Sequence, residues 1–63
     1  MKLTYHFHLV ANTGNQADGI VSANTPLSEP GAYTRLREAI GEAQGLLSED
    51  FTLTSLSLVH TEP

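Results

Sequence analysis

A chain of 63 residues and 6.8 kDa has room for one hydrophobic core, so the sequence predicts a single domain spanning residues 1–63. Seven acidic residues against three Lys and Arg give a net charge of −4, which argues against direct contact with nucleic acid or with an anionic membrane. Cysteine is absent, so neither disulfides nor thiolate metal sites are expected. The apolar runs are short and the first residues do not resemble a signal peptide, so we expect a cytoplasmic protein.

Residues 2–11 alternate between apolar and polar side chains, which is typical of a strand with one buried face. Asn12-Thr13-Gly14-Asn15 has the composition of a turn and is expected to join this strand to a second one in a hairpin. The side chains that we expect to point into the core are Leu3, Tyr5, Phe7 and Leu9, while Lys2, Thr4, His6 and His8 point to the other side.

The second strand is predicted over residues 16–24, with small side chains opposite the large ones of the first strand. In the favoured register Gly19, Val21 and Ala23 point into the core and Asp18, Ile20, Ser22 and Asn24 point away. A slip by one residue inverts this assignment. A bulge at Asp18-Gly19 is a second alternative, and it changes the face of the residues before it.

A helix is predicted over residues 29–44, after Thr25-Pro26 ends the second strand. Ser28 is the expected N-cap, and Gly45 is expected at the left-handed position that follows the helix. The stripe expected to face the sheet consists of Ala32, Tyr33, Leu36, Ala39, Ile40 and Ala43, and the solvated face of Arg35, Arg37, Glu38 and Glu42. Gly41 lies inside the helix without an explanation in this pattern.

A third strand is predicted over residues 52–60, which are rich in Thr, Leu and Val. Leu56 and Leu58 are expected to face the helix. Phe51 and Leu53 have the opposite parity, so the strand either begins late or contains a bulge, and Phe51 is expected to close one end of the core.

These elements predict an α+β fold, a two-layer ββαβ sandwich with a three-stranded antiparallel sheet in the order 2-1-3 and one helix on one face. The predicted core consists of Leu3, Tyr5, Phe7, Leu9, Val21, Leu36, Ile40, Leu46, Leu56 and Leu58. The other face of the sheet has no segment left to cover it.

The hairpin with Gly14 at its turn, the entry into the helix at Pro26 and the last strand Thr54-Ser55-Leu56-Ser57-Leu58 form a recognisable arrangement. It resembles the short, uncharacterised ββαβ proteins of phage and prophage origin, over the whole chain and at the level of pattern. The resemblance implies an accessory protein that acts on a host or phage protein, and it assigns no functional residue.

Candidate chemistry is sparse. His6 and His8 place two imidazoles on one strand face, and Asp18 or His60 is available as a third zinc ligand, but structural zinc favours four ligands and no Cys is present. Ser55 or Ser57 with a histidine and Asp18 has the composition of a catalytic triad without a nucleophile elbow or an oxyanion loop. We therefore predict no catalytic, metal or cofactor-binding residues, and no enzyme activity.

The predicted function is a small non-catalytic protein-binding module, such as a phage or mobile-element inhibitor or adaptor. One alternative is a structural protein that self-associates as a homodimer, and another is an acidic DNA mimic that acts as an inhibitor. The expected partner is a protein or a second copy of the chain. Its contact surface is predicted on the uncovered sheet face, at Thr4, His6, His8, Ile20, Ser22, Ser55, Ser57 and Val59.

Overall fold

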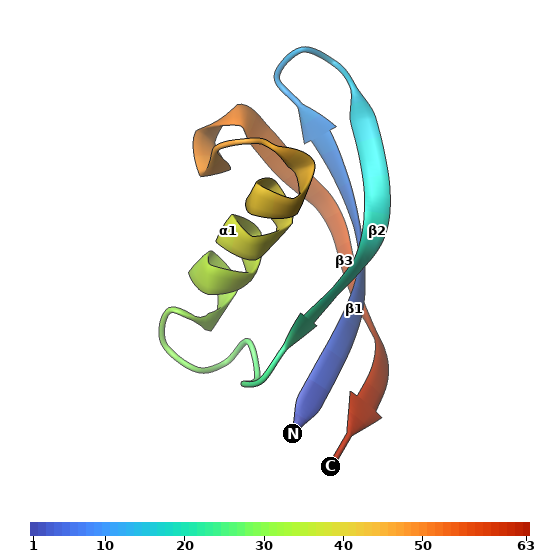
Figure 1. Cartoon of the computed structure of the whole chain (residues 1–63), viewed down its shortest axis with the longest axis vertical. Helices are drawn as coiled ribbons and strands as arrows, with labels where there is room; N and C mark the ends of the chain where they lie inside the picture. The colour runs from blue at the N-terminus through green and yellow to red at the C-terminus, as the bar shows by residue number, and fades with distance from the viewer.

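Three antiparallel strands and one α-helix follow one another in ββαβ order in the computed structural model, which describes all 63 residues (Figure 1). The elements are β1 (Lys2–Ala11), β2 (Gln16–Ala23), α1 (Ala32–Gln44) and β3 (Phe51–Glu62), with a short 3-10 helix (Ser48–Asp50) before β3. The sheet has the order β2-β1-β3, and α1 lies against one of its sides. The predicted fold class and strand order are confirmed.

The hairpin has the favoured register of the sequence analysis. Gly14 in its turn has a φ of 92°, a backbone conformation that glycine adopts without strain. Tyr5 pairs with Val21 and Phe7 pairs with Gly19 in an unbroken ladder, so the alternative of a bulge at Asp18-Gly19 is wrong. A Cβ atom on Gly19 would lie 3.1 Å from Cζ of Phe7, which shows how closely this ring packs on the backbone of β2.

Two bulges in β3 explain the conflicting parity of its apolar residues. His8 of β1 pairs with Ser55 while Leu9 pairs with Leu53, which leaves Thr54 as an extra residue. The ladder shifts again between Thr4 and Tyr5, and there Val59 is the extra residue. Because a bulge changes the facing of the residues beyond it, Phe51 and Leu53 lie on the same side as Leu56 and Leu58. The bulged alternative is confirmed, and the strand is longer at both ends than predicted.

The start of α1 differs from the prediction. The helix begins at Ala32 rather than Glu29, and its N-cap is Gly31, which has a φ of 79° and no side-chain cap, so the assignment of Ser28 as N-cap is wrong. Glu29 N–H donates to the Pro26 carbonyl at 3.0 Å. This turn, followed by the left-handed Gly31, occupies the segment that was predicted as the first helical turn.

The end of α1 agrees with the prediction and explains Gly41. Gly45 has a φ of 72°, and Leu46 N–H donates to the Gly41 carbonyl at 2.8 Å, as in a Schellman ending. A Cβ atom on Gly41 would lie 2.7 Å from the carbonyl oxygen of Leu46 and 3.0 Å from Cε1 of Phe51. The chain therefore needs glycine here because the segment leaving the helix folds back over it.

The core lies between α1 and the sheet, with β1 at its centre. Its buried residues are Leu3, Tyr5, Phe7, Leu9, Leu36, Ile40 and Phe51, against which Val21, Leu46, Leu53 and Leu56 are partly buried. The prediction of Leu58 as a core residue is wrong, because it is 54% exposed. The prediction that Tyr33 faces the sheet is also wrong, because it is 45% exposed. A 13-residue helix is about 20 Å long, whereas the molecule measures 38 Å along its longest axis. Part of the sheet therefore extends beyond the helix, towards the end where both termini lie (Figure 1).

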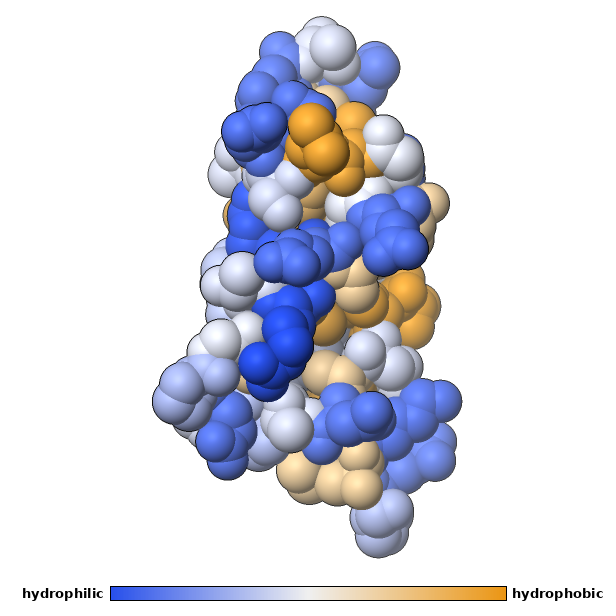
Figure 2. Space-filling view, turned by 60° about the vertical axis from the view of Figure 1, so that its left-hand side comes forward, coloured by the Kyte–Doolittle hydropathy of each residue, from blue (hydrophilic) through white to orange (hydrophobic).

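The helix side of the molecule is mostly hydrophilic, and its apolar side chains form separate patches (Figure 2). Arg37, which was predicted to be solvated, is instead a structural residue. Its guanidinium donates to the carbonyls of Ser48 at 2.7 Å and Phe51 at 3.2 Å, and lies 4.8 Å from the centre of the Phe51 ring. Neither α1, with 13 residues, nor the shorter 3-10 helix has the length and apolar character of a membrane-spanning helix.

Candidate functional site on the uncovered sheet face

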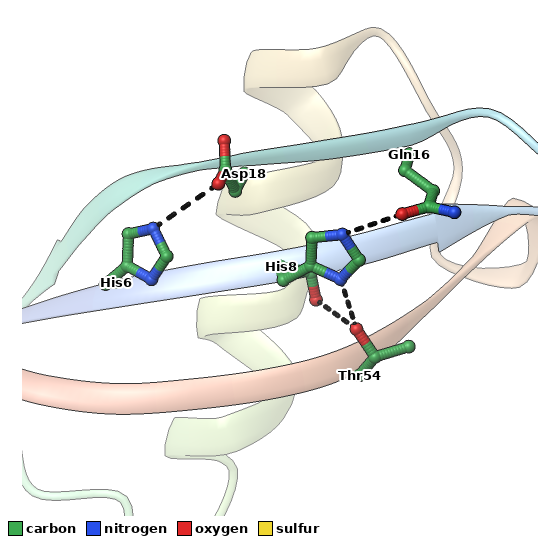
Figure 3. Close-up of polar contacts among 5 residues, drawn as sticks. All are labelled: His6, His8, Gln16, Asp18 and Thr54. Carbon is green, nitrogen blue, oxygen red and sulfur yellow. Dashed lines mark hydrogen bonds and ion pairs between the residues drawn. The ribbon is translucent and has the colours of Figure 1, made fainter.

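The outer face is the side of the sheet that points away from α1. In Figure 3 the helix lies behind the sheet, and no segment of the chain crosses in front of the strands in this region. All three strands contribute to this face because successive side chains of a strand point to opposite sides. The predicted contact residues on it are Thr4, His6 and His8 from β1, Ile20 and Ser22 from β2, and Ser55, Ser57 and Val59 from β3.

The pairing of the strands brings seven of these eight residues into adjacent rows. Thr4 lies opposite Ser22, and His6 lies between Ile20 and Ser57. His8 lies between Asp18 and Ser55, in the next row. Directly opposite side chains in a sheet are about 5 Å apart, so each row forms a continuous contact surface.

Val59 is the exception, because it is the extra residue of the second bulge and has no paired partner on β1. It is 55% exposed, and Ile20 on the opposite edge of the sheet is 62% exposed. The outer face therefore has one large apolar side chain near each edge and imidazoles and hydroxyls between them. Such a mixture of apolar anchors and hydrogen-bonding groups is typical of the interior of a protein interface.

The cavities of the molecule lie elsewhere. One of about 410 Å³ is lined by residues of the hairpin and of the end of α1, including Leu9, Ala17 and Leu46. A second, of about 210 Å³, lies between the end of β2 and α1 and is lined by Ala23, Ala32 and Arg35 among others. Both are on the helix side. The histidines consequently lie on an open surface rather than in a pocket that excludes water.

His8 is held in place from both neighbouring strands (Figure 3). The hydroxyl of Thr54 donates to the backbone carbonyl of His8 at 3.2 Å. Because this uses its only hydrogen, the same hydroxyl accepts from Nδ1–H of the His8 ring. On the other side, Nε2 of His8 lies 3.2 Å from Oε1 of Gln16. The extra residue of the first bulge thus fixes both the backbone and the ring of His8.

These partners suit both charge states of the His8 ring. With Nδ1 protonated, the imidazolium donates from Nε2 to the amide oxygen of Gln16, while the neutral ring accepts from the amide nitrogen of the same side chain. Rotation of the Gln16 amide by half a turn exchanges its oxygen and its nitrogen as the partner of His8 Nε2. The ring can therefore keep its orientation when it gains or loses a proton.

His6 is held less tightly. Its Nε2 is 3.7 Å from Oδ2 of Asp18, and the two side chains are 44% and 64% exposed (Figure 3). This distance is too long for a hydrogen bond, and the contact is an ion pair only when the ring is protonated. Exposed pairs of this kind contribute little to stability.

The arrangement of the outer face does not assemble the chemistry considered from the sequence. No group of three His, Asp or Glu side chains is placed to hold a metal ion. The hydrogen bonds of His8 go to Thr54 and Gln16, and none joins Ser55 or Ser57 to a histidine. Sequence reasoning missed both partners of His8, because the position of Thr54 depends on the bulge.

Replacing Thr54 by Val is expected to lower the free energy of unfolding by about 1 kcal/mol, because the bulge loses its hydrogen bonds to the His8 ring and carbonyl. Thr52→Val is the matched control on the same strand, since Thr52 is also exposed but makes no side-chain hydrogen bond. Urea unfolding of the two variants measures the difference. Equal midpoints for the two variants would show that Thr54 does not stabilise the bulge.

A search of protein-family models, curated proteins and solved structures finds no match to this chain.

Proposed function

We propose that this chain is a non-catalytic protein-binding module that uses the outer face of its sheet to contact a protein partner. The observation that carries the proposal is the lack of any covering element over a sheet face on which Ile20 and Val59 are more than half exposed. Large exposed apolar side chains are the usual anchors of an interface, and the imidazole and hydroxyl groups between Ile20 and Val59 supply directional hydrogen bonds.

The shape of the outer face supports binding rather than catalysis. Catalytic groups act best in a concave site that excludes water and fixes donors around the reacting atoms. His6 and His8 lie on an open surface, and both cavities of the molecule are on the opposite side of the sheet. An open surface with apolar and hydrogen-bonding groups fits the surface of a folded protein.

The resemblance to short phage and prophage proteins supports an inhibitor or adaptor that acts on a host or phage protein. A cytoplasmic location belongs to the same proposal, and it is supported by the absence of cysteine from the chain. The seven acidic residues are dispersed over β2, α1, the loops and the end of β3, which does not favour imitation of a nucleic-acid backbone.

Ile20→Lys is expected to weaken partner binding by at least about tenfold, because it places a charged side chain at an apolar anchor. The measurement is capture of proteins from a lysate of the native host on immobilised chain, quantified by mass spectrometry for each variant. Circular dichroism confirms beforehand that each variant is folded.

Thr34→Lys is the matched control, since it adds the same charge at an exposed position of α1 and is expected to leave the captured proteins unchanged. If Thr34→Lys abolishes capture and Ile20→Lys preserves it, the helix is the binding surface and the proposal is wrong.

A further inference from the structure

The free edge of β3 is the second unusual surface of the molecule. β1 is paired on both sides, so β2 and β3 each leave one row of backbone N–H and C=O groups without a strand partner. Proteins commonly protect such edges with Lys, Pro, a short strand or a bulge, because an unprotected edge pairs with other strands. The two edges of this sheet are protected to different extents.

The edge of β2 is shorter than that of β3 and carries a charge. It has eight residues, with the acidic Asp18 and the side-chain-free Gly19 near its middle. β3 has twelve residues, and none of those from Phe51 to Val59 is charged or proline. Over this stretch its protection consists of the two bulges, at Thr54 and Val59. Charge appears only at the end of the strand, at Glu62. Between them, residues 55–58 pair regularly with β1.

Exposed apolar side chains gather at the same part of this edge. Leu58 on the helix side of the sheet is 54% exposed, and Val59 beside it is 55% exposed. Leu56 is only partly buried. α1 packs closer to β2 than to β3, so Leu58 and Val59 on this edge are left uncovered. The C-terminal end of β3 also extends beyond α1 (Figure 1).

We propose that β3 pairs with β3 of a second copy of the chain, antiparallel and about a two-fold axis at Ser57, to form a continuous six-stranded sheet. In an antiparallel ladder, directly opposite residues lie on the same face. A register centred on Ser57 places Leu56 of each copy opposite Leu58 of the other, so two such pairs form. It also places Ser55 opposite Val59. The exposed Leu58 of each copy therefore gains an apolar neighbour, Leu56, across the seam.

The charges of the chain favour a second copy as the occupant of this edge. The whole chain has a net charge of −4, yet the seam is neutral from Phe51 to Val59. In the Ser57 register, Glu62 lies opposite Thr52, so no acidic residue faces another one. A foreign strand that is recognised by its charges would find no charged group to pair with along this stretch. An identical strand is also uncharged there, so the two strands match.

The expected strength follows from the size of the seam. Strands paired over residues 52–62 run side by side for about 35 Å, but a strand edge is narrow and the bulges interrupt its regular part. Stable interfaces bury about 800 Å² on each partner, which a strand edge with a few side chains does not reach easily. The dimer is therefore expected to be weak, with a dissociation constant on the order of 100 µM, and to exchange with the monomer.

Both helices of this dimer lie on the same side of the six-stranded sheet, because the two-fold axis is perpendicular to it. The outer faces of the two copies then join into one surface of twice the area. The inference does not rest on the proposed function, since it concerns the edge of the sheet and its test needs no partner protein.

Sedimentation equilibrium of the full chain, from about 10 µM to about 1 mM, measures the association. The expected average mass rises from 6.8 kDa at low concentration towards twice that value. Ser57→Lys and Ser57→Asp each place like charges against themselves at the two-fold axis, so each variant alone is expected to remain at the monomer mass over the whole range. An equimolar mixture of the two restores the doubled mass, because opposite charges then meet at the axis.

Ser22→Lys on the opposite edge is the matched control, and it retains the association of the natural chain because Ser22 is also exposed on the outer face. Ile20→Lys retains it as well, which separates edge pairing from association through the outer face. The proposal is overturned if the natural chain stays monomeric at the highest concentration. It is overturned equally if Ser57→Lys still dimerises, or if the mixture of the two Ser57 variants stays monomeric.

Discussion

Phe7→Ala is expected to abolish folding at room temperature. The Phe7 side chain is 3% exposed at the centre of β1, where its ring packs on the backbone of Gly19 and on the residues of α1 and β3 that close the core. Truncation of a buried Phe to Ala costs about 3–5 kcal/mol. Domains have about 0.05–0.15 kcal/mol of stability per residue, so a chain of 63 residues has about 3–9 kcal/mol in total. The loss is of the same size as the whole stability.

Far-ultraviolet circular dichroism and the dispersion of amide signals in a proton–nitrogen NMR spectrum measure this loss. Tyr33→Ala is the control, because it removes an aromatic ring of similar size from a half-exposed position on α1. Its expected change in the free energy of unfolding is below about 1 kcal/mol, since Ala also has a higher helix propensity than Tyr. A Tyr33→Ala variant as unstable as Phe7→Ala would contradict the placement of the core under β1.

Gly41→Ala is the second substitution with a large expected effect, and its sign is the informative part. In the interior of an ordinary helix this change stabilises by about 1 kcal/mol, because Ala is the better helix former. Here the new Cβ atom would lie 2.7 Å from the carbonyl oxygen of Leu46 and 3.0 Å from the Phe51 ring. A backbone oxygen cannot move without displacing the segment that connects α1 to β3. The expected result is a net loss of about 1–3 kcal/mol, as in an overpacked core.

Glu42→Ala at the next position of the helix is the control, with an expected change near zero because Glu42 is exposed. Thermal unfolding of both variants gives the comparison. A Gly41→Ala variant with a raised midpoint would show that the end of the helix is looser than the contact with Leu46 indicates.

The fold was predictable because its strongest signals are local. The alternation from Leu3 to Leu9 defines the buried face of β1, and the turn at Gly14 fixes the register of β2. Gly45 at the end of α1 was predictable for the same reason, since a left-handed glycine after an apolar stripe is a regular helix ending.

The wrong predictions fall where one local signal competes with another, or where the position of the helix on the sheet decides burial. Ser28 is a good N-cap by residue type, but the Pro30-Gly31 pair favours a turn, and Gly31 adopts a positive φ that delays the helix to Ala32. Leu58 has the right parity for the core, but it lies on the edge strand and is 54% exposed, whereas its partner Tyr5 on the central strand is buried. Parity alone contains no information about which strands the helix covers.

The candidate site was predictable as a set of positions but not as a set of contacts. The alternation of β1 places His6 and His8 on the outer face without any structure. The contacts of His8 with Thr54 and Gln16 depend on a bulge whose presence was indicated by the parity of Phe51 and Leu53, but whose position was not. Val59 is likewise an outer-face residue whose exact place depends on the second bulge.

NMR mapping of the contact with a captured partner tests most directly whether the outer face is the binding surface. The isotope-labelled chain is titrated with that protein while the amide signals of all residues and the ring signals of His6 and His8 are followed. The largest shifts are expected on the histidine rings and on the amides of Ile20 and Ser22, with the amides of Arg35, Glu38 and Glu42 unchanged. Shifts concentrated on those three helix residues, with unchanged histidine rings, would contradict it.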